Sequence, residues 1–202
     1  MEQGDHSPSA DDTQQADGRR LRSERSRERI VRAMFALIKE GDMTPSAASV
    51  AARAGVGLRT VFRHFEDMDS LYGEMSEIIA AEIMPKAQAP FTGSGWRENL
   101  QEVIQRRAEI YEEIFPLRVS ANVRRFQSPF LMEKYHSTLQ MERRTLQEML
   151  PEEIVSDRTL FAAVEMSVAF QTWRRLRQDQ GLSPGEAEDT MRLMVESLVR
   201  DY

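Results

Sequence analysis

The chain has 202 residues, of which 41% are hydrophobic and 30% are charged, and it contains no cysteine. This composition is typical of a soluble globular protein with one large domain or two small ones, and the lack of cysteine excludes disulfides and cysteine-ligated metals. No apolar run reaches the roughly 18 residues of a membrane span, and the polar, acidic N-terminus excludes a secretory signal. We therefore expect a cytoplasmic protein that does not enter the membrane.

The net charge of −6 is unevenly distributed along the chain. Residues 1–18 carry −5, residues 19–65 carry +7, and residues 66–202 carry −8. A basic segment within an acidic protein is the charge pattern expected of a nucleic-acid contact. The alternative is a charged helix face that is only solvated.

The N-terminal region combines a polar tail with a basic helix. Residues 1–18 lack apolar periodicity, so we predict a disordered acidic tail. An arginine-rich stretch from Arg19 to Arg32 then leads into the first helix. The apolar residues of that helix recur at helical spacing, and Gly41 ends it; they are Ile30, Met34, Leu37 and Ile38.

Two short helices are predicted at residues 46–54 and 58–65, joined by Gly55-Val56-Gly57. Gly55 is expected to end the first of them in the left-handed conformation. Two helices linked by a tight glycine-containing turn form a helix-turn-helix. At about 100° per residue, the second helix separates into an apolar side and a polar side. The apolar side contains Leu58, Val61, Phe62 and Phe65, and the polar side contains Arg59, Thr60, Arg63 and His64. An ordinary surface helix also turns polar residues outward, but it usually mixes charges, and this face carries no acid.

The stretch from Ser46 to Phe65 closely resembles the DNA-binding signature of the TetR family of transcriptional regulators. The matching elements are Val50-Ala51, Ala54-Gly55-Val56, Thr60-Val61-Phe62, Arg63-His64-Phe65 and the following Leu71. The resemblance implies an all-α fold of about nine helices, with a three-helix DNA-binding domain followed by a ligand-binding and dimerising bundle. It further implies a homodimeric repressor without a cofactor, released from a palindromic DNA operator by a small apolar or aromatic molecule.

The resemblance places the DNA contacts on the second helix of the motif and at the start of the first, and we add the arginine arm as a hypothesis of our own. The expected residues are Thr44, Ser46, Gly57, Leu58, Arg59, Thr60, Phe62, Arg63, His64, Arg25 and Arg27. Three positions depart from the family pattern: Gly57 replaces a capping Ser or Thr, Phe62 replaces a Tyr, and Met68 replaces a Lys. Each change removes a contact that positions the protein on the DNA backbone. We hypothesise that the arginine arm compensates by contacting phosphates or the minor groove.

The rest of the chain is predicted to be helical. Helices are expected at 69–84, 96–115, 129–150, 157–178 and 183–202, with a loop at 85–95 and a short segment at 116–126. Pro85 is expected to stop the first of these helices, and Ser128 is expected to cap the helix that begins at Pro129. The predicted domains are therefore a DNA-binding domain at 19–67 and a ligand-binding and dimerisation domain at 68–202.

Candidates for the ligand pocket are the aromatic and neighbouring residues of the C-terminal helices, the alternative being that each belongs to the core, as most such aromatics do. They are Tyr111, Phe115, Phe126, Phe130, Tyr135, His136, Phe161, Glu165, Met166 and Phe170. Because an unpaired charge in an apolar run is costly, Glu165 is expected either to pair with an arginine across the dimer or to bind a cationic or hydroxylated ligand.

The last two helices are apolar on more than one side, which favours a dimer interface, the alternative being that they complete the monomer core. The interface candidates are Trp173, Leu176, Met191, Met194, Val195 and Leu198.

No catalytic or metal-binding pattern is present in the sequence. The three histidines, His6, His64 and His136, are widely separated, and there is no glycine-rich phosphate loop or zinc-protease signature. We therefore do not expect an enzyme. The alternatives are an all-α enzyme and a protein of this fold that acts through a protein partner.

Overall fold

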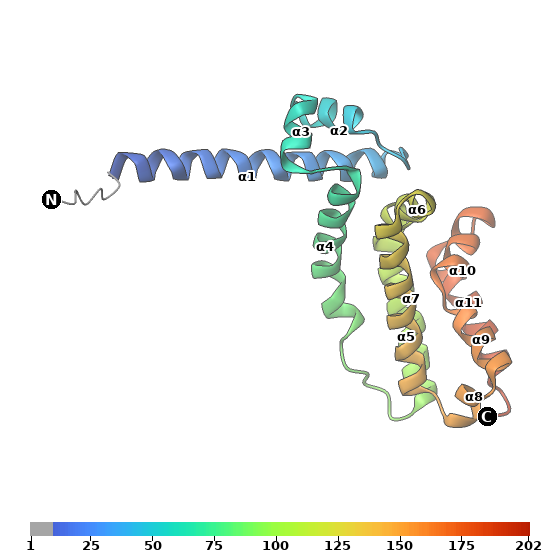
Figure 1. Ribbon diagram of the computed structural model, residues 1–202. Helices are drawn as coiled ribbons and strands as arrows, with labels where there is room; N and C mark the ends of the chain where they lie inside the picture. Colours follow the sequence, from blue (N-terminus) through green and yellow to red (C-terminus); the bar gives the residue numbers. More distant parts are fainter. Residues whose placement is uncertain (1–9) are drawn as a thin grey trace. The chain divides into compact units, whose positions relative to one another are not determined.

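The computed structural model describes residues 10–202, which form eleven α-helices and no strand (Figure 1). This confirms the all-α prediction. The chain divides into two compact units, Met1–Met75 and Ser76–Tyr202. The division falls inside helix α4 (Met68–Ala87) rather than at residue 67, because Leu71, Tyr72 and Met75 belong to the core of the first unit. No helix within residues 10–202 is both long and apolar enough to cross a membrane.

The first unit contains α1 (Ala10–Lys39), α2 (Ala47–Ala54), α3 (Leu58–His64) and the start of α4. Figure 1 shows α2 and α3 packed beside the second half of the long helix α1. In each of these helices, the apolar side chains recur at helical spacing and point into a shared core. The larger buried residues of this core are Ile30, Val31, Met34, Ile38, Val50, Val61, Phe65, Leu71, Tyr72 and Met75.

Helix α1 begins within the segment that was expected to be a disordered tail. The structure has helix from Ala10 onwards, while residues 1–9 of that segment lie outside the described residues. No proline interrupts residues 10–39. Further along the helix, the i,i+4 ion pairs Arg20–Glu24 and Glu28–Arg32 support the helical turn. The lack of an apolar pattern therefore did not prevent helix formation.

The turn between α2 and α3 has the geometry expected from its glycines. Gly55 adopts a left-handed conformation, with φ 64° and ψ 38°, which a side chain would disfavour. Gly57 is extended and lies at the N-cap of α3 without a side-chain hydrogen bond, as expected from the absence of a hydroxyl there. At the other end of α2, Ser46 and Ser49 form a reciprocal capping box.

The second unit is a bundle built from the end of α4 and the remaining helices. In chain order these are α5 (Trp96–Glu113), α6 (Phe115–Arg124), a 3-10 turn η1 (Arg125–Gln127), α7 (Pro129–Met149), α8 (Glu152–Ser156), α9 (Arg158–Ser167), α10 (Phe170–Arg174), a π-helical turn η2 (Arg175–Asp179) and α11 (Pro184–Leu198). The N-cap predicted at Ser128 is present and accepts a hydrogen bond from its helix. Ser183, for which no cap was predicted, likewise caps α11.

Two boundaries in the second unit differ from expectation. Helix α4 continues past Pro85 to Ala87, because a proline so near the helix end removes only one hydrogen bond and leaves the last turn intact. The helix expected at 157–178 is broken after Ser167: Val168 leaves the helical conformation and Ala169 is extended. The carbonyl of Val168 is freed by this break and accepts hydrogen bonds from Arg107 and Tyr111, which periodicity alone does not predict.

Candidate functional site

The outward surface of α3 combines two cations with two apolar side chains. Arg59 and Arg63 are exposed, as predicted. Leu58 and Phe62 were expected on the buried side, but they are 46% and 49% exposed. The prediction was wrong for these two because α3 has only seven residues and is anchored on the core by Val61 together with Phe65, its C-cap residue. The surface that α3 offers to a partner is therefore both basic and apolar.

His64 is less available on this surface than its helical angle suggests. It is partly buried, and its Nε2 atom is buried without a hydrogen-bond partner among the described residues. Burial lowers the pKa of His64, and the nearby cations Arg63 and Arg27 lower it further. The imidazole is therefore neutral at neutral pH and adds no charge to the surface.

Arg27 was expected to contact DNA, but the structure uses its guanidinium inside the first unit. It donates to both carboxylate oxygens of Glu74 on α4, at 3.0 and 2.6 Å, and to the main-chain carbonyl of His64 at 2.8 Å. It also lies over the ring of Phe65, with 4.5 Å from Cζ to the ring centroid. Because His64 is the last residue of α3, this cation satisfies a free carbonyl at the negative end of the helix dipole.

A different set of arginines forms the exposed stripe of α1. At about 100° per residue, Arg22, Arg25, Arg29 and Arg32 fall within about 80° of one another, and all four are exposed. Arg27 lies on the opposite side of the helix, in line with the buried Ile30, Met34 and Ile38. This alignment was visible in the sequence: Arg27 precedes Met34 by seven residues, which is the spacing of a shared helix face.

Thr44 and Ser46 are exposed at the N-terminal end of α2, where they were expected. The Ser46 hydroxyl accepts a hydrogen bond from the Ser49 amide at 3.1 Å, and the Thr44 amide donates to Asp42 at 3.1 Å. Both residues therefore stabilise the local backbone, and the positive end of the α2 dipole faces outward beside them.

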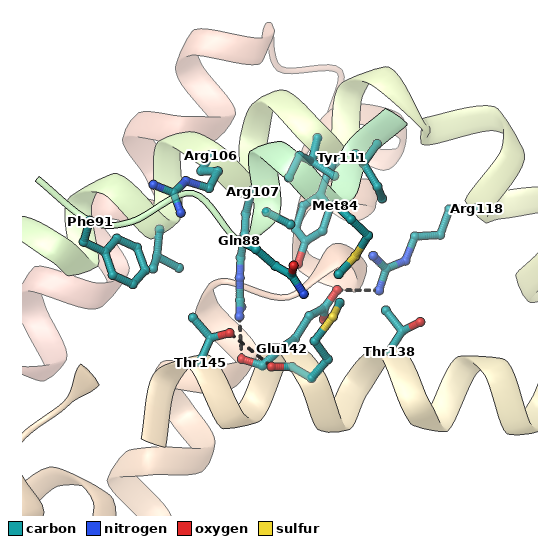
Figure 2. Close-up of a pocket in the computed structure, with 15 residues that line it drawn as sticks. Met84, Gln88, Phe91, Arg106, Arg107, Tyr111, Arg118, Thr138, Glu142 and Thr145 are labelled. Carbon is teal, nitrogen blue, oxygen red and sulfur yellow. Dashed lines mark hydrogen bonds and ion pairs between the residues drawn. The ribbon is translucent and has the colours of Figure 1, made fainter. Parts of the chain in front are cut away.

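A cavity of about 110 Å³ lies in the second unit among the end of α4, α5, α6 and α7. Much of its lining is apolar, from residues such as Ile83, Met84 and Val103. Polar side chains from three helices also reach it, and Figure 2 shows Arg107 and Arg118 both directed towards Glu142. A concave apolar site with a few convergent polar groups is typical of small-molecule binding.

The polar groups of this cavity are tightly connected. Arg118 and Glu142 form a buried ion pair at 2.8 Å, and Arg107 donates to the carbonyls of Val168 at 3.1 Å and Glu142 at 2.6 Å. Burial alone lowers the pKa of Arg118, but the Glu142 carboxylate, together with Tyr111 and Tyr135, more than offsets this, so the pKa is raised. Burial raises the pKa of Tyr111, and Glu142 raises it further, so this hydroxyl stays protonated at neutral pH.

Of the ten residues expected to line a ligand pocket, only Tyr111 lines this cavity. Phe161 and Phe170 are fully buried core residues, whereas Phe126 and Met166 are 73% and 57% exposed. The others lie away from the cavity: Phe130 and Tyr135 are partly buried, His136 is exposed, and Phe115 borders a separate hollow near Arg177. Sequence reasoning searched for aromatic residues, whereas most of the lining is aliphatic, methionine or arginine.

Glu165 has a partner within its own chain. Its carboxylate pairs with Arg143 at 2.5 Å, and Arg143 in turn lies 4.8 Å from the centroid of the Phe161 ring. Both side chains are partly exposed, so the charge expected to need a ligand or a second subunit is already paired at the surface of the bundle.

Four of the six residues expected at a dimer interface belong instead to the monomer core. Trp173, Met191 and Val195 are completely buried, and Leu176 is 5% exposed. Their broad apolar stripes are needed to contact α5 and α9 within the same chain, which is the alternative that the sequence left open. Met194 and Leu198 are only partly buried, and the neighbouring Leu193 is 65% exposed.

Two solved structures resemble the chain over most of its length. A transcriptional regulator from Rhodococcus sp. Rha1 matches with a TM-score of 0.67 and 20% identity, covering 86% of this chain and 96% of the other. A protein from Mesorhizobium loti MAFF303099, assigned to the TetR family of transcriptional regulators, matches with a TM-score of 0.56 and 21% identity, covering 89% and 97%. No family model and no curated protein sequence matches the chain. The chain therefore has the fold of a TetR-family transcriptional regulator, as its helix-turn-helix signature predicted.

Proposed function

We propose that the protein is a DNA-binding transcriptional regulator whose recognition helix is α3. The observation that carries this proposal is the exposed surface of α3, which offers Arg59 and Arg63 beside Leu58 and Phe62 and contains no acid. Arginine forks match guanine edges and phosphates, and apolar side chains contact the methyl group of thymine. The two solved structures of this fold, which are described as transcriptional regulators, support the same conclusion.

The remaining contacts in this proposal position the protein on the DNA backbone. Thr44 and Ser46 bring the N-terminus of α2 to a phosphate. The exposed arginine stripe of α1, Arg22, Arg25, Arg29 and Arg32, adds phosphate contacts that Phe62 and Met68 do not supply. Arg27 orients α3 from behind, through Glu74 and the His64 carbonyl.

The active form in this proposal is a homodimer on a palindromic operator. A helix-turn-helix protein reads two half-sites about one DNA turn apart, which requires two recognition helices related by a two-fold axis. With Trp173, Met191 and Val195 in the monomer core, the second copy would cover the outward face of α11, where Leu193 is exposed and Met194 partly so. Exchanging Leu193→Glu would shift the protein towards monomer in light scattering, and Glu196→Gln on the same helix would not.

Regulation in this proposal comes from a small molecule in the cavity of the second unit, which releases a repressor from its operator. Helix α4 supports such a link because it contributes to both regions. Leu71 and Tyr72 are buried in the core of the first unit, and Ile83 and Met84 line the cavity. A ligand that displaces the end of α4 would therefore disturb the residues on which α3 rests.

The decisive test is a gel shift on the DNA that flanks the gene, over a series of salt concentrations. We expect affinity to fall steeply as salt rises, because each phosphate contact releases counterions. Exchanging Arg59 and Arg63 together for alanine should abolish the specific shift. Arg144→Ala is the matched control, because Arg144 is an exposed cation on α7 that pairs with Glu148 on the same helix.

Loss of binding in the Arg144→Ala control, or binding that does not respond to salt, would contradict the proposal. A specific complex with a protein, formed through α3 without DNA affinity, would favour the alternative of a partner-binding protein with this fold.

A further inference from the structure

The cavity of the second unit carries more positive charge than its own carboxylates neutralise. Arg118 is paired with Glu142, and Arg106 lies 3.7 Å from Glu102 on the same helix and donates to the carbonyl of Ala89. Arg107 is different. Both hydrogen bonds that its guanidinium makes within residues 10–202 end on main-chain carbonyls, although the residue is only 9% exposed.

A buried cation without a carboxylate is costly unless its surroundings supply negative charge. The carbonyl of Val168, which ends α9, supplies part of it through the negative end of the helix dipole. The two carbonyl dipoles do not cancel the full positive charge of Arg107, so the cavity keeps a net attraction for one anion. A cationic guest would instead meet three guanidinium groups.

The rest of the lining sets the size and polarity of the guest. Ile83, Met84, Val103 and Met141 offer apolar walls, and Tyr111 presents a hydroxyl that stays protonated. A volume of 110 Å³ is comparable with the roughly 150 Å³ apolar cavity known to admit benzene. The space therefore suits a body of about one ring with a single polar group.

We propose that this cavity binds a small monocarboxylate with an apolar or aromatic body, its carboxylate lying against Arg107 and Arg118. This inference rests on the proposed function for its biological meaning, since the anion would be the regulatory ligand. Charge-assisted hydrogen bonds from arginine to a carboxylate give both affinity and orientation. Glu142, held by Arg118 and the neighbouring Arg107, keeps the two guanidinium groups in place to receive it.

The test compares three ring compounds of one size and different charge: benzoate, benzamide and benzylamine. Calorimetric titration of the full chain without DNA should show benzoate binding at least about tenfold more tightly than either of the others. Equal or tighter binding of benzamide or benzylamine would overturn the inference. So would the absence of benzoate binding at millimolar concentration.

Two variants and one control locate the charge preference. Arg107→Gln should remove it, and Arg144→Gln, on the exposed side of α7, should leave it unchanged. Because Arg107 also holds two carbonyls, its exchange could weaken folding. Gln88→Glu avoids that difficulty, since Gln88 lines the cavity but is exposed. The added carboxylate should weaken benzoate binding and strengthen benzylamine binding, and no change in either would contradict the proposed site.

The titration and the gel shift fail independently. Charge-selective benzoate binding by a chain that does not bind DNA would leave the cavity assignment standing and refute the regulator. Salt-dependent DNA binding by a chain that prefers benzamide would support the regulator and refute the cavity assignment.

Discussion

The two units of this protein use arginine in opposite ways. In the first unit, Arg59 and Arg63 are exposed on α3, so their positive charge is available to a large polyanion at the surface. In the second unit, Arg107 and Arg118 are buried against carbonyls and Glu142, so their charge is available only to something small enough to enter the bundle. Arginine content alone therefore does not identify a nucleic-acid surface, because the burial of each guanidinium determines which anions can reach it.

Breaking the buried arginine network should have the largest effect on stability. Arg118→Met leaves Glu142 as an unpaired charge in a site where both side chains are less than 15% exposed. We expect a loss of about 3 kcal/mol in the free energy of unfolding, measured by urea denaturation.

The matched control is Arg144→Met, which removes an i,i+4 pair on the same helix α7 whose side chains are 78% and 63% exposed. A pair so exposed contributes about 0.5 kcal/mol or less. An equal loss of unfolding free energy in Arg118→Met and Arg144→Met would show that the cavity is open to water. The contrast between exposed arginines in the first unit and buried arginines in the second would then be wrong.

Arg27 tests the same contrast inside the first unit, because it is the arginine of α1 that turns inward. Arg27→Met should cost about 1–2 kcal/mol, since it removes the charged hydrogen bonds to Glu74 and leaves the His64 carbonyl without its donor. Arg27→Met should also weaken DNA binding, because α3 would be held less firmly.

Arg25→Met, on the exposed arginine stripe of α1, should reduce DNA affinity and its salt dependence without changing the urea midpoint.

The contribution of Arg27 should also depend on pH in the acid range. Hydrogen bonding from Arg27 lowers the pKa of Glu74 below its ordinary value of 4.5. The stabilisation is therefore present above pH 4.5 and is lost as the pH falls through the lower, folded-state pKa. The stability gap between the natural chain and Arg27→Met should narrow below pH 4.5, and a gap that widened there would exclude this ion pair as its cause.

Sequence reasoning succeeded where a local pattern fixes the structure. The left-handed Gly55, the uncapped Gly57 and the N-cap at Ser128 were predicted because each depends on neighbours within one helical turn. The all-α fold followed from helical periodicity in the same way. The predicted start of helix α1 was too late, because periodicity detects apolar residues at helical spacing, and the sequence before Arg19 has no such pattern.

Sequence reasoning was weaker where distant segments decide the outcome. The cavity is assembled from α4, α5, α6 and α7, and its arginines are held by a carbonyl that becomes free only where α9 breaks at Val168. A broad apolar stripe, as at Trp173 and Met191, does not tell whether its partner is the same chain or a second copy. Here the partner is the monomer core.

A smaller effect should follow from restoring a polar group to the exposed face of α3. Phe62 is 49% exposed and stands where the resembling family commonly has Tyr. Phe62→Tyr adds one hydroxyl within reach of a phosphate and should strengthen DNA binding by about fivefold, the value of roughly one hydrogen bond. Phe130→Tyr on α7 adds the same hydroxyl in the second unit and should leave DNA affinity unchanged. A weaker complex for Phe62→Tyr would indicate that the ring contacts a thymine methyl instead.

The smallest effect is expected at Gly57, the uncapped N-terminus of α3. Its backbone is extended with φ −71°, and an added Cβ would meet no atom within 4 Å, so a side chain fits without strain. Gly57→Ser should supply the missing cap for the α3 amides and restrict the unfolded chain, which together stabilise the protein by about 0.5 kcal/mol. Gly55→Ser is the informative counterpart, because the left-handed φ of 64° there makes any side chain unfavourable, so this variant should lose stability. Opposite signs for two serines placed two residues apart would show that the turn geometry, and not the added hydroxyl, controls how firmly α3 is held.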